Sequence, residues 1–451
     1  MKNVFNKIKQ VYMIGIKGTG MSALAVNLKS MGIKVSGSDY AESFFTDSLL
    51  AKHRIKVKSP YSSDNIPTDA DLVIASTAYN NKNPELQEAE RRGLKIVSYP
   101  QMLGLITKRL PSVAVCGSHG KTTTSGILAY ILSKTTYRPI VNVGSIVPQL
   151  INYHASDPKL FVFEADEYQN KFQYFYPKIV ILTNIDYDHP DYFKNPAHYK
   201  SVFREFIKRI PRFGLLIYCA DDKNCRDVAR YAKCKKISYG FSKYSDQKID
   251  VDSVLPHQMQ FAVGDLGKFN AKLLGNHNAM NLAAALLCSG FLKVPAAITK
   301  KAIAVFTGTK RRLEITSKLK INGHDCIVID DFGHHPTEIK ATIATIKAAY
   351  PDKTLWAVFQ PHSFSRTEAL FDDFTKAFDR ADNTIVLDIY ASKREVSGKV
   401  SSRDLVKKMK GQTYYQPDIK KAAVFLKKKI NSDSIILTIG ASEIWRLAEL
   451  L

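Results

Sequence analysis

The sequence has few of the features that mark membrane or secreted proteins. It contains no run of about 18 apolar residues, so a membrane-spanning helix is not expected. Its N-terminal segment passes from a basic lead into an apolar strand without a small-residue cleavage site, which disfavours a secretory signal. Its six cysteines are scattered and never spaced C-x-x-C, which predicts reduced thiols in a cytoplasmic protein. Tandem repeats and low-complexity linkers are also lacking.

The composition is that of a globular protein, with 45% apolar and 24% charged residues, but the formal net charge is +23. Such a charge suggests nucleic-acid binding, because clustered Lys and Arg neutralise phosphates. Here the basic residues form only short, separated runs, as at 310–312 and 427–429, and none is interleaved with aromatics. We therefore expect a solvated lysine-rich surface, no nucleic-acid partner and no membrane partner. An acidic small substrate would also suit this charge.

The 451-residue length exceeds one ordinary core, so two or three domains are expected. Strands and helices alternate in three blocks, whose first strands begin near residues 11, 112 and 324. This alternation predicts an α/β fold with mostly parallel sheets covered by helices. The predicted domains are 1–108, 109–315 and 316–451, with a small strand-rich insertion at 244–270.

The first block contains a glycine-rich turn between a strand and a helix, Gly18-x-Gly20-x-x-Ala23, followed by Asp39 at the end of the next strand. This pattern matches a dinucleotide fingerprint and predicts a diphosphate at the helix N-terminus. It does not distinguish NAD from a nucleotide sugar, so an NAD-dependent dehydrogenase stays an alternative. A turn that only packs the helix on the strand is the other alternative.

The second block contains VCGSHGKTTT (115–124), a near match to the phosphate-binding loop G-x-x-x-x-G-K-[ST]. Val115 stands where the outer glycine is expected, which a tighter loop using Gly117 and Gly120 would tolerate. Lys121 would then contact the outer phosphates of a nucleotide, and Thr122 would bind magnesium. The alternatives are a small-residue turn with a surface lysine, or a basic nucleic-acid-binding ATPase.

Two acidic clusters follow strands of the same block, at 163–168 and 183–189. The carboxyl ends of parallel strands are where α/β proteins place their chemistry, so a carboxylate and an imidazole there could complete a metal site with Thr122. Magnesium prefers oxygen ligands, which makes a histidine ligand unusual on general grounds.

Four further polar clusters occupy residues 275–281, 310–314, 330–336 and 360–366. Asparagine can read the edge of a base, and arginine can bind phosphate or carboxylate through two hydrogen bonds. Each cluster taken singly is more often structural. Their number near predicted strand ends favours a functional interpretation.

Together these motifs resemble the Mur ligase family, ATP-dependent enzymes that add amino acids to the UDP-muramyl precursor of peptidoglycan. The resemblance covers nearly the whole chain and includes the loop 117–123, Glu164 and the segment 184–189. Three stretches are similar to members that attach L-alanine to UDP-N-acetylmuramate: 15–22, 330–339 and 360–367. Three others are similar to members that attach a recycled peptide: 98–101, 164–168 and 310–314. The C-terminal block, which receives the incoming amine, favours L-alanine.

The resemblance implies an ADP-forming ligase that works in peptidoglycan synthesis through an acyl phosphate. It also implies three domains: a Rossmann-like UDP-sugar domain, a P-loop-type ATPase domain and a Rossmann-like amino-acid domain. The site residues that it implies are as follows: Gly18, Thr19, Gly20, Ser38 and Asp39 for the UDP end; Gly117, Ser118, His119, Gly120, Lys121, Thr122, Thr123, His277, Asn278, Asn281, Arg312 and Asp331 for ATP; Thr122, Glu164 and His189 for two Mg²⁺ ions; and His334, His335 and Arg366 for L-alanine, with Lys121, His189 and Arg312 also catalytic.

Two departures from the family pattern stand out. Many alanine ligases carry an arginine-acid pair where this chain has Tyr99-Pro-Gln, and Ser363 occupies a position that is sometimes arginine. We therefore expect altered sugar-nucleotide contacts and greater reliance on Arg366 for alanine. Domain closure and a monomer or weak homodimer are also expected.

Overall fold

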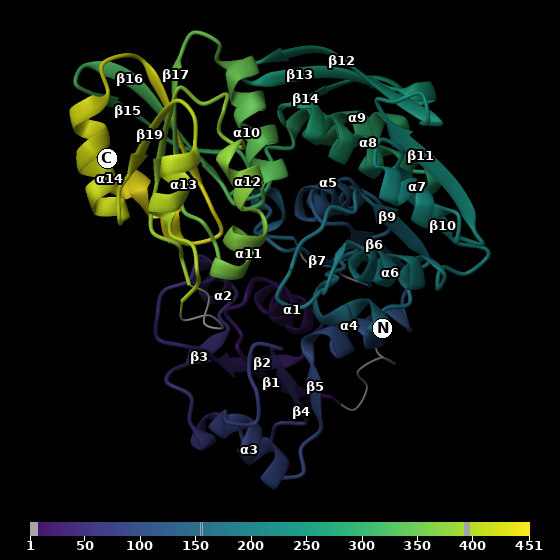
Figure 1. The fold of residues 1–451 in the computed structure, drawn as a ribbon. Helices are drawn as coiled ribbons and strands as arrows, with labels where there is room; N and C mark the ends of the chain where they lie inside the picture. Colours follow the sequence, from purple (N-terminus) through teal and green to yellow (C-terminus); the bar gives the residue numbers. More distant parts are fainter. Residues whose placement is uncertain (1–7, 154, 156, 392–396) are drawn as a thin grey trace. The chain divides into compact units, whose positions relative to one another are not determined.

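The computed structural model describes residues 8–153, 155, 157–391 and 397–451 (Figure 1). Within this part of the chain, no helix is long and apolar enough to cross a membrane. The contacts between residues divide the chain into two compact units. The first unit comprises Met1–Ile185, Lys200–Gln247 and Asn281–Ile303, and the second comprises Asp186–Tyr199, Lys248–Met280 and Ala304–Leu451.

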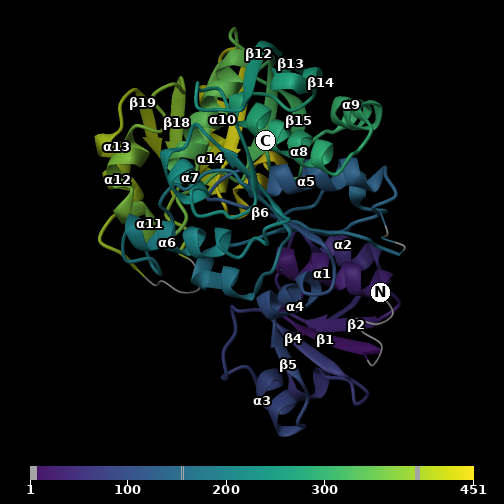
Figure 2. The same cartoon turned by 90° about the vertical axis from the view of Figure 1, so that its right-hand side faces the viewer.

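The N-terminal sheet of the first unit is parallel throughout, with the strand order β3-β2-β1-β4-β5. Helices cover both faces of this sheet: α1 and α4 lie on one side and α3 on the other (Figures 1 and 2). Because the strand order reverses between β1 and β4, the turn after β1 lies at the point where such sheets bind ligands. The elements are β1 (Gln10–Ile14), α1 (Thr19–Ser30), β2 (Lys34–Ser38), α2 (Asp47–Lys52), β3 (Lys56–Lys58), β4 (Leu72–Ala75), α3 (Pro84–Arg91), β5 (Ile96–Ser98) and α4 (Tyr99–Thr107).

The second sheet of the first unit runs in the order β11-β10-β9-β6-β8-β7, again with parallel strands. Its central strand β6 pairs with β8 on one side and β9 on the other, so the loops after these three strands meet at one edge. The elements of this part of the chain are β6 (Ser112–Cys116), α5 (Lys121–Ser133), β7 (Ile140–Asn142), β8 (Phe161–Glu164), β9 (Ile179–Leu182), α6 (Pro196–Ile207), β10 (Leu215–Cys219), α7 (Lys223–Ala229), β11 (Lys235–Gly240), α8 (Asn276–Phe291) and α9 (Ala296–Val305).

The second unit contains three antiparallel strands, β12 to β14, and a separate sheet in the order β15-β16-β20-β17-β18-β19. Only β15 is antiparallel in that sheet. Helices α10, α12 and α13 pack on one face of this sheet, and α14 packs on the other. Each face of the sheet has an apolar cluster beneath its helices. The elements are β12 (Gln247–Leu255), β13 (Gln258–Val263), β14 (Gly267–Ala271), β15 (Glu314–Ile321), β16 (His324–Asp331), α10 (Pro336–Ala349), β17 (Thr354–Phe359), α11 (Phe364–Ala369), α12 (Phe371–Thr375), β18 (Asn383–Val386), α13 (Ser402–Lys408), β19 (Gln412–Tyr415), α14 (Ile419–Lys429) and β20 (Ser434–Ile439).

The structure confirms the predicted α/β class with mostly parallel sheets. The antiparallel strands β12 to β14 occupy the insertion that was expected at 244–270. Strand β5 ends at Ser98, because Ser98 and Gln101 form a capping box that starts α4 at Tyr99. Helices α11 and α12 are separated at Leu370.

The buried face of α10 packs against the sheet of the second unit within one of its apolar clusters. Ile343 is 1% exposed within the cluster between α10 and the sheet, so truncation to alanine leaves a cavity. We predict that Ile343→Ala lowers the free energy of unfolding by about 2–5 kcal/mol. The control is Val424→Ala on α14, where the side chain is 66% exposed and the expected change is within about 0.5 kcal/mol. Urea unfolding followed by circular dichroism measures both, and equal losses would contradict the assignment of this core.

Candidate active site

The loop between β6 and α5 has a backbone that only glycine adopts readily at two positions. Gly117 and Gly120 have φ values of 133° and 79°. A side chain at Gly117 would collide with Thr183 and Asn184, and one at Gly120 with Asn281. Val115 lies two residues before Gly117, fully buried in β6 and paired with Glu164 of β8 and Ile181 of β9. The position at which the standard loop has its outer glycine is therefore a core position of β6 in this protein, and it lies outside the turn.

The residues after β9 clamp this loop. Thr183 Oγ1 donates to the carbonyl of His119 at 2.6 Å, and Asn184 Oδ1 accepts from His119 N at 2.8 Å. Asn184 Nδ2 also donates to the His119 carbonyl, and its own carbonyl accepts from Ser118 N at 3.2 Å. The amides of Ser118 and His119 thus serve the clamp. The first turn of α5, from Lys121 to Thr123, is the part of the loop whose N–H groups have no partners within the helix.

Lys121 folds back over its own loop. Its ammonium donates to the carbonyls of Gly117 and Ser118 and forms an ion pair with Glu167, with Nζ 3.2 Å from Oε2. Burial alone would lower the pKa of Lys121, but the negative charges of Glu167, Glu164 and Asp166 outweigh it and raise that pKa. Lys121 is therefore a charged group in a largely enclosed, acidic environment.

Thr122 and Glu164 form an oxygen pair beside this lysine. Thr122 Oγ1 donates to Glu164 Oε2 at 2.9 Å, and the same carboxylate oxygen accepts from Gly144 N at 2.8 Å. A hydroxyl and a carboxylate at the start of a helix are the oxygen donors that Mg²⁺ prefers. The donor set at Thr122 and Glu164 thus fits a magnesium ion.

The base of the loop is linked to α8 through Asn281. Its side-chain oxygen accepts a hydrogen bond from Thr124 Oγ1 at 3.1 Å, and the side chain lies against Gly120. Asn281 therefore supports the phosphate loop directly, in addition to the adenine contact expected from the sequence.

The predicted diphosphate turn of the first sheet is held by Asp39. Its Oδ2 accepts from Lys17 N at 2.8 Å, and its Oδ1 accepts from the hydroxyls of Tyr61 and Tyr79 at 3.1 and 3.2 Å. Ser38, just before it, donates to the buried carboxylate of Glu85. The side chains of both residues predicted here for the UDP end are thus already engaged in hydrogen bonds within the protein.

Gly18 is the residue before α1, and Thr19 and Gly20 form its first turn. A side chain at Gly20 would collide with Tyr99, whose hydroxyl donates to Asn142 Oδ1 at 2.7 Å. Asn142 Nδ2 donates in turn to the carbonyl of Gly20 at 3.2 Å. Tyr99 therefore joins α1 to β7 and lies beside the predicted diphosphate turn.

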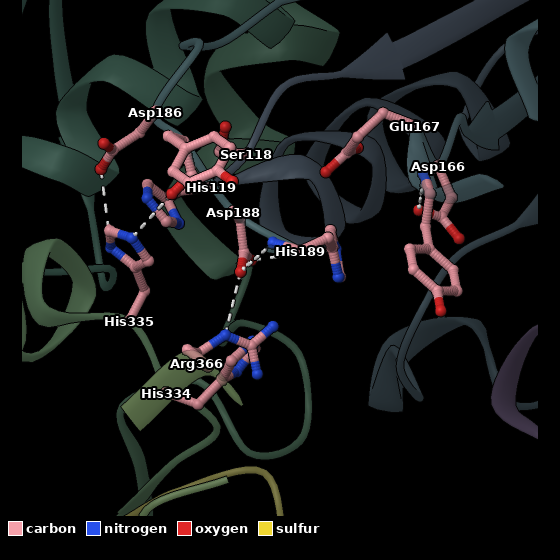
Figure 3. Close-up of polar contacts among 12 residues, drawn as sticks. Ser118, His119, Asp166, Glu167, Asp186, Asp188, His189, His334, His335 and Arg366 are labelled. Atoms are coloured by element: carbon pink, nitrogen blue, oxygen red, sulfur yellow. Dashed lines mark hydrogen bonds and ion pairs between the residues drawn. The ribbon is translucent and has the colours of Figure 1, made fainter. Parts of the chain in front are cut away.

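In the second unit, Asp188 and Arg366 form a buried ion pair (Figure 3). Arg366 Nε donates to Asp188 Oδ1 at 2.9 Å, and the two side chains are 6% and 7% exposed. Burial raises the pKa of Asp188, but the charge of the adjacent Arg366 guanidinium outweighs it and holds that pKa well below its usual range. The same carboxylate accepts from His189 N at 2.7 Å, so Asp188 connects the predicted alanine-binding arginine to the predicted metal-binding histidine.

The two adjacent histidines before α10 have different surroundings. Burial, together with the charge of Arg366, lowers the pKa of His334 to about 3, so this imidazole is neutral. His335 Nδ1 accepts from Thr337 N at 3.3 Å and caps α10, while Nε2 lies 3.3 Å from the carbonyl of Tyr187. This pattern places a hydrogen on Nε2 of His335.

The remaining predicted ATP residues of the second unit lie near the start of α8 and the end of β16. Arg312 pairs with Glu338 at 3.5 Å, and its guanidinium lies over the ring of Phe332. Burial raises the pKa of Asp331 to about 6 despite the charge of Arg312, and its two oxygens accept from Leu313 N and Gly333 N. His277 lies near Thr345 Oγ1, and Asn278 donates to the carbonyl of Leu274.

The structure brings predicted residues together in three groups: the phosphate loop with Glu164 and Asn281, the glycine turn with Ser38 and Asp39, and Arg366 with His334. No role was expected for Glu167, Asp188 or Asn184, although all three lie in the acidic clusters at 163–168 and 183–189. Their position directly after buried parallel strands was the available signal.

The depressed pKa of His334 makes stability depend on pH. The imidazole titrates near 6.5 when unfolded and near 3 when folded, so its contribution is complete above pH 6.5 and is lost as the pH falls below that value. When the pH is lowered from about 7.5 to about 5, we expect the free energy of unfolding to fall in both proteins. The fall is roughly 1–2 kcal/mol smaller in His334→Asn than in the unaltered protein. Urea unfolding at both pH values tests this, and identical pH slopes would refute it.

Comparison with known proteins adds independent information. Three family models match the chain: "Mur ligase family, catalytic domain" at residues 10–110, "Mur ligase middle domain" at 115–289 and "Mur ligase, glutamate ligase domain" at 311–442. The curated UDP-N-acetylmuramate–L-alanine ligase of Acetivibrio thermocellus is 36% identical and covers 99% of this chain and 96% of its own. That of Caldanaerobacter subterraneus subsp. tengcongensis is also 36% identical, over 98% and 97% of the two chains.

Solved structures agree with this result. A UDP-N-acetylmuramate-alanine ligase from Thermotoga maritima superposes with a TM-score of 0.80 at 26% identity, covering 98% of both chains. A murein peptide ligase from Psychrobacter arcticus shares the fold, with a TM-score of 0.70 at 22% identity and the same 98% coverage of both chains. From the three matched domains and the near-full-length relatives, the chain belongs to the Mur ligase family.

Proposed function

We propose that this protein ligates L-alanine to UDP-N-acetylmuramate, with ATP converted to ADP and phosphate. The observation that carries the proposal is the phosphate loop, in which Lys121 and the Thr122–Glu164 pair converge at the edge formed by β6, β8 and β9. The relatives that cover nearly the whole chain are named as enzymes of this activity.

In this reaction the lactyl carboxylate of the sugar nucleotide attacks the γ-phosphorus of ATP, giving an acyl phosphate and ADP. The amine of alanine then attacks the acyl carbon and releases phosphate. The carboxylate, the transferred phosphoryl group and ADP are all anionic, so the protein contributes mainly charge neutralisation and positioning. Lys121 supplies a positive charge to the outer phosphates, and the first turn of α5 supplies N–H donors.

Mg²⁺ would be held by Thr122 and Glu164, with His189 proposed as the ligand of a second ion. When bound, these ions neutralise the charge that develops on the phosphate oxygens. The hydrogen bond from Gly144 N to Glu164 positions that carboxylate for the role.

The other roles are assigned by unit. In the first unit, Gly18 to Gly20 bind the diphosphate of the sugar nucleotide, and Asp39 with Ser38 positions the turn that receives it. In the second unit, Arg366 binds the alanine carboxylate while Asp188 fixes its orientation, and His334 and His335 line the same site. Residues His277, Asn278, Asn281, Arg312 and Asp331 are assigned to ATP.

We propose the domain boundaries 1–108, 109–315 and 316–451 for these three functions. The proposed location is the cytoplasm, and the six buried cysteines, all unpaired, suit a reducing compartment. Neither nucleic acid nor membrane is a proposed partner, and the proposed state is a monomer or weak homodimer.

The first prediction is a strict dependence on three substrates. Phosphate release requires ATP, UDP-N-acetylmuramate and L-alanine together, and Lys121→Ala lowers its rate about 100-fold or more, because the lysine charge acts on the transferring phosphoryl group. A coupled phosphate assay measures this. Lys134→Ala, at the far end of α5, is the control that keeps its rate. Full phosphate release from ATP alone would overturn the proposal.

The second prediction concerns the amine. In the presence of ATP and the sugar nucleotide, kcat/KM is highest for L-alanine, followed by L-serine and glycine, and the tripeptide L-Ala-γ-D-Glu-meso-diaminopimelate is not used. The stretches around Tyr99 and Glu167 resemble peptide-attaching members of the family, so the tripeptide is the informative competitor. Use of the tripeptide without use of L-alanine would replace the proposed activity with peptide recycling.

A further inference from the structure

The ammonium of Lys121 has all of its donors engaged by groups of the protein itself. An ammonium has three N–H donors, and those of Lys121 have three acceptors: the carbonyls of Gly117 and Ser118 and the carboxylate of Glu167. Both oxygens of Glu167 lie within reach, at 3.4 Å for Oε1 and 3.2 Å for Oε2. For Lys121 to bind phosphate oxygens, at least one of these three contacts must be given up.

The contact with Glu167 is the one that a phosphate would replace most directly. It joins opposite charges in a site where the lysine side chain is 13% exposed and the glutamate 1% exposed. In such an enclosed site the attraction between the two charges is strong. Either charge would destabilise the protein if it lost its partner. A phosphate oxygen is likewise an anionic acceptor, so it can take over the role of Glu167 without leaving the ammonium unpaired.

We propose that Glu167 is a positioning residue that holds Lys121 over its own loop in the nucleotide-free protein, so that Glu167 and the ATP phosphates compete for one ammonium. The inference rests on the proposed function, since it concerns the lysine assigned to ATP. Glu167 follows the metal-site acid Glu164 by three residues on the segment after β8, so one segment presents both the proposed metal ligand and the competing carboxylate. The pair keeps the lysine charged and oriented, and it makes ATP binding weaker than an unopposed lysine would allow.

This competition has a defined sign in binding experiments. Glu167→Gln removes the competing charge at nearly constant size, so ATP binds about 5-fold more tightly or better, while Lys121→Met weakens binding. In the double variant, the Gln substitution has no further effect, because the lysine for which it competed is absent. The dissociation constant for ATP is measured by calorimetry in EDTA without the sugar nucleotide, which excludes both turnover and the metal site.

A neighbouring acid provides the matched control. Asp166 also carries a negative charge near Lys121, but its side chain is bonded to Lys171 and to Tyr168 N. Asp166→Asn therefore removes the same charge without touching the lysine contact, and we expect its effect on the ATP dissociation constant to be less than about 2-fold. Glu167→Asp keeps the charge but shortens its reach, so it gives ATP affinity between those of the unaltered protein and Glu167→Gln. It also serves as the test if Glu167→Gln does not fold.

Thermal unfolding gives a second readout. Glu167→Gln lowers the unfolding temperature without nucleotide, because the buried lysine loses its charged partner, and ATP raises that temperature more than in the unaltered protein.

Three outcomes overturn the inference: equal or weaker ATP binding by Glu167→Gln, an equal tightening by Asp166→Asn, or tightening that persists in the Lys121→Met background. Failure of the unaltered protein to bind ATP when Mg²⁺ is also present would overturn the proposed function together with it. An ATP dissociation constant that is unchanged by substitution of Glu167 would overturn this inference alone.

Discussion

The site depends on the pairing of β6 with β8 and β9. This parallel pairing brings three loops to one edge of the sheet: the glycine loop, the segment from Glu164 to Glu167 and the Thr183–Asn184 pair. The hydrogen bonds of Thr183 and Asn184 determine the course of the glycine loop, and Glu164 and Glu167 surround its lysine. A change in the register of either neighbouring strand would move all of these groups relative to Lys121.

The polar groups of the site are arranged so that buried charges are paired. Lys121 has Glu167, and Arg366 has Asp188. Such pairs cost desolvation and add little stability compared with apolar packing, which suggests that they are retained for orientation. In the proposed reaction a phosphate takes the place of Glu167 at Lys121, whereas Asp188 keeps the Arg366 guanidinium in position.

Several roles that the sequence predicted are more complex in the structure. The amides of Ser118 and His119, expected to ring an anion, hold the loop to the residues after β9. Asp39, expected to reach a ribose, accepts hydrogen bonds from Lys17 N and two tyrosines. In both cases the partner lies more than 20 positions away in the sequence. A motif predicts which groups can bind a ligand, but its spacing does not indicate which of them the protein itself will use.

The sequence by itself determined the α/β class, the three blocks, the phosphate loop and the family. These features follow from local properties: apolar runs that form buried strands, glycines that permit positive φ, and motif residues a few positions apart. Only the tertiary structure decided that Glu167 holds Lys121, that Asp188 holds Arg366, and that Tyr99 reaches Asn142 beside the diphosphate turn. Those contacts join residues that are 43 to 178 positions apart in the sequence. The folding of the sheets decides which of these distant side chains meet.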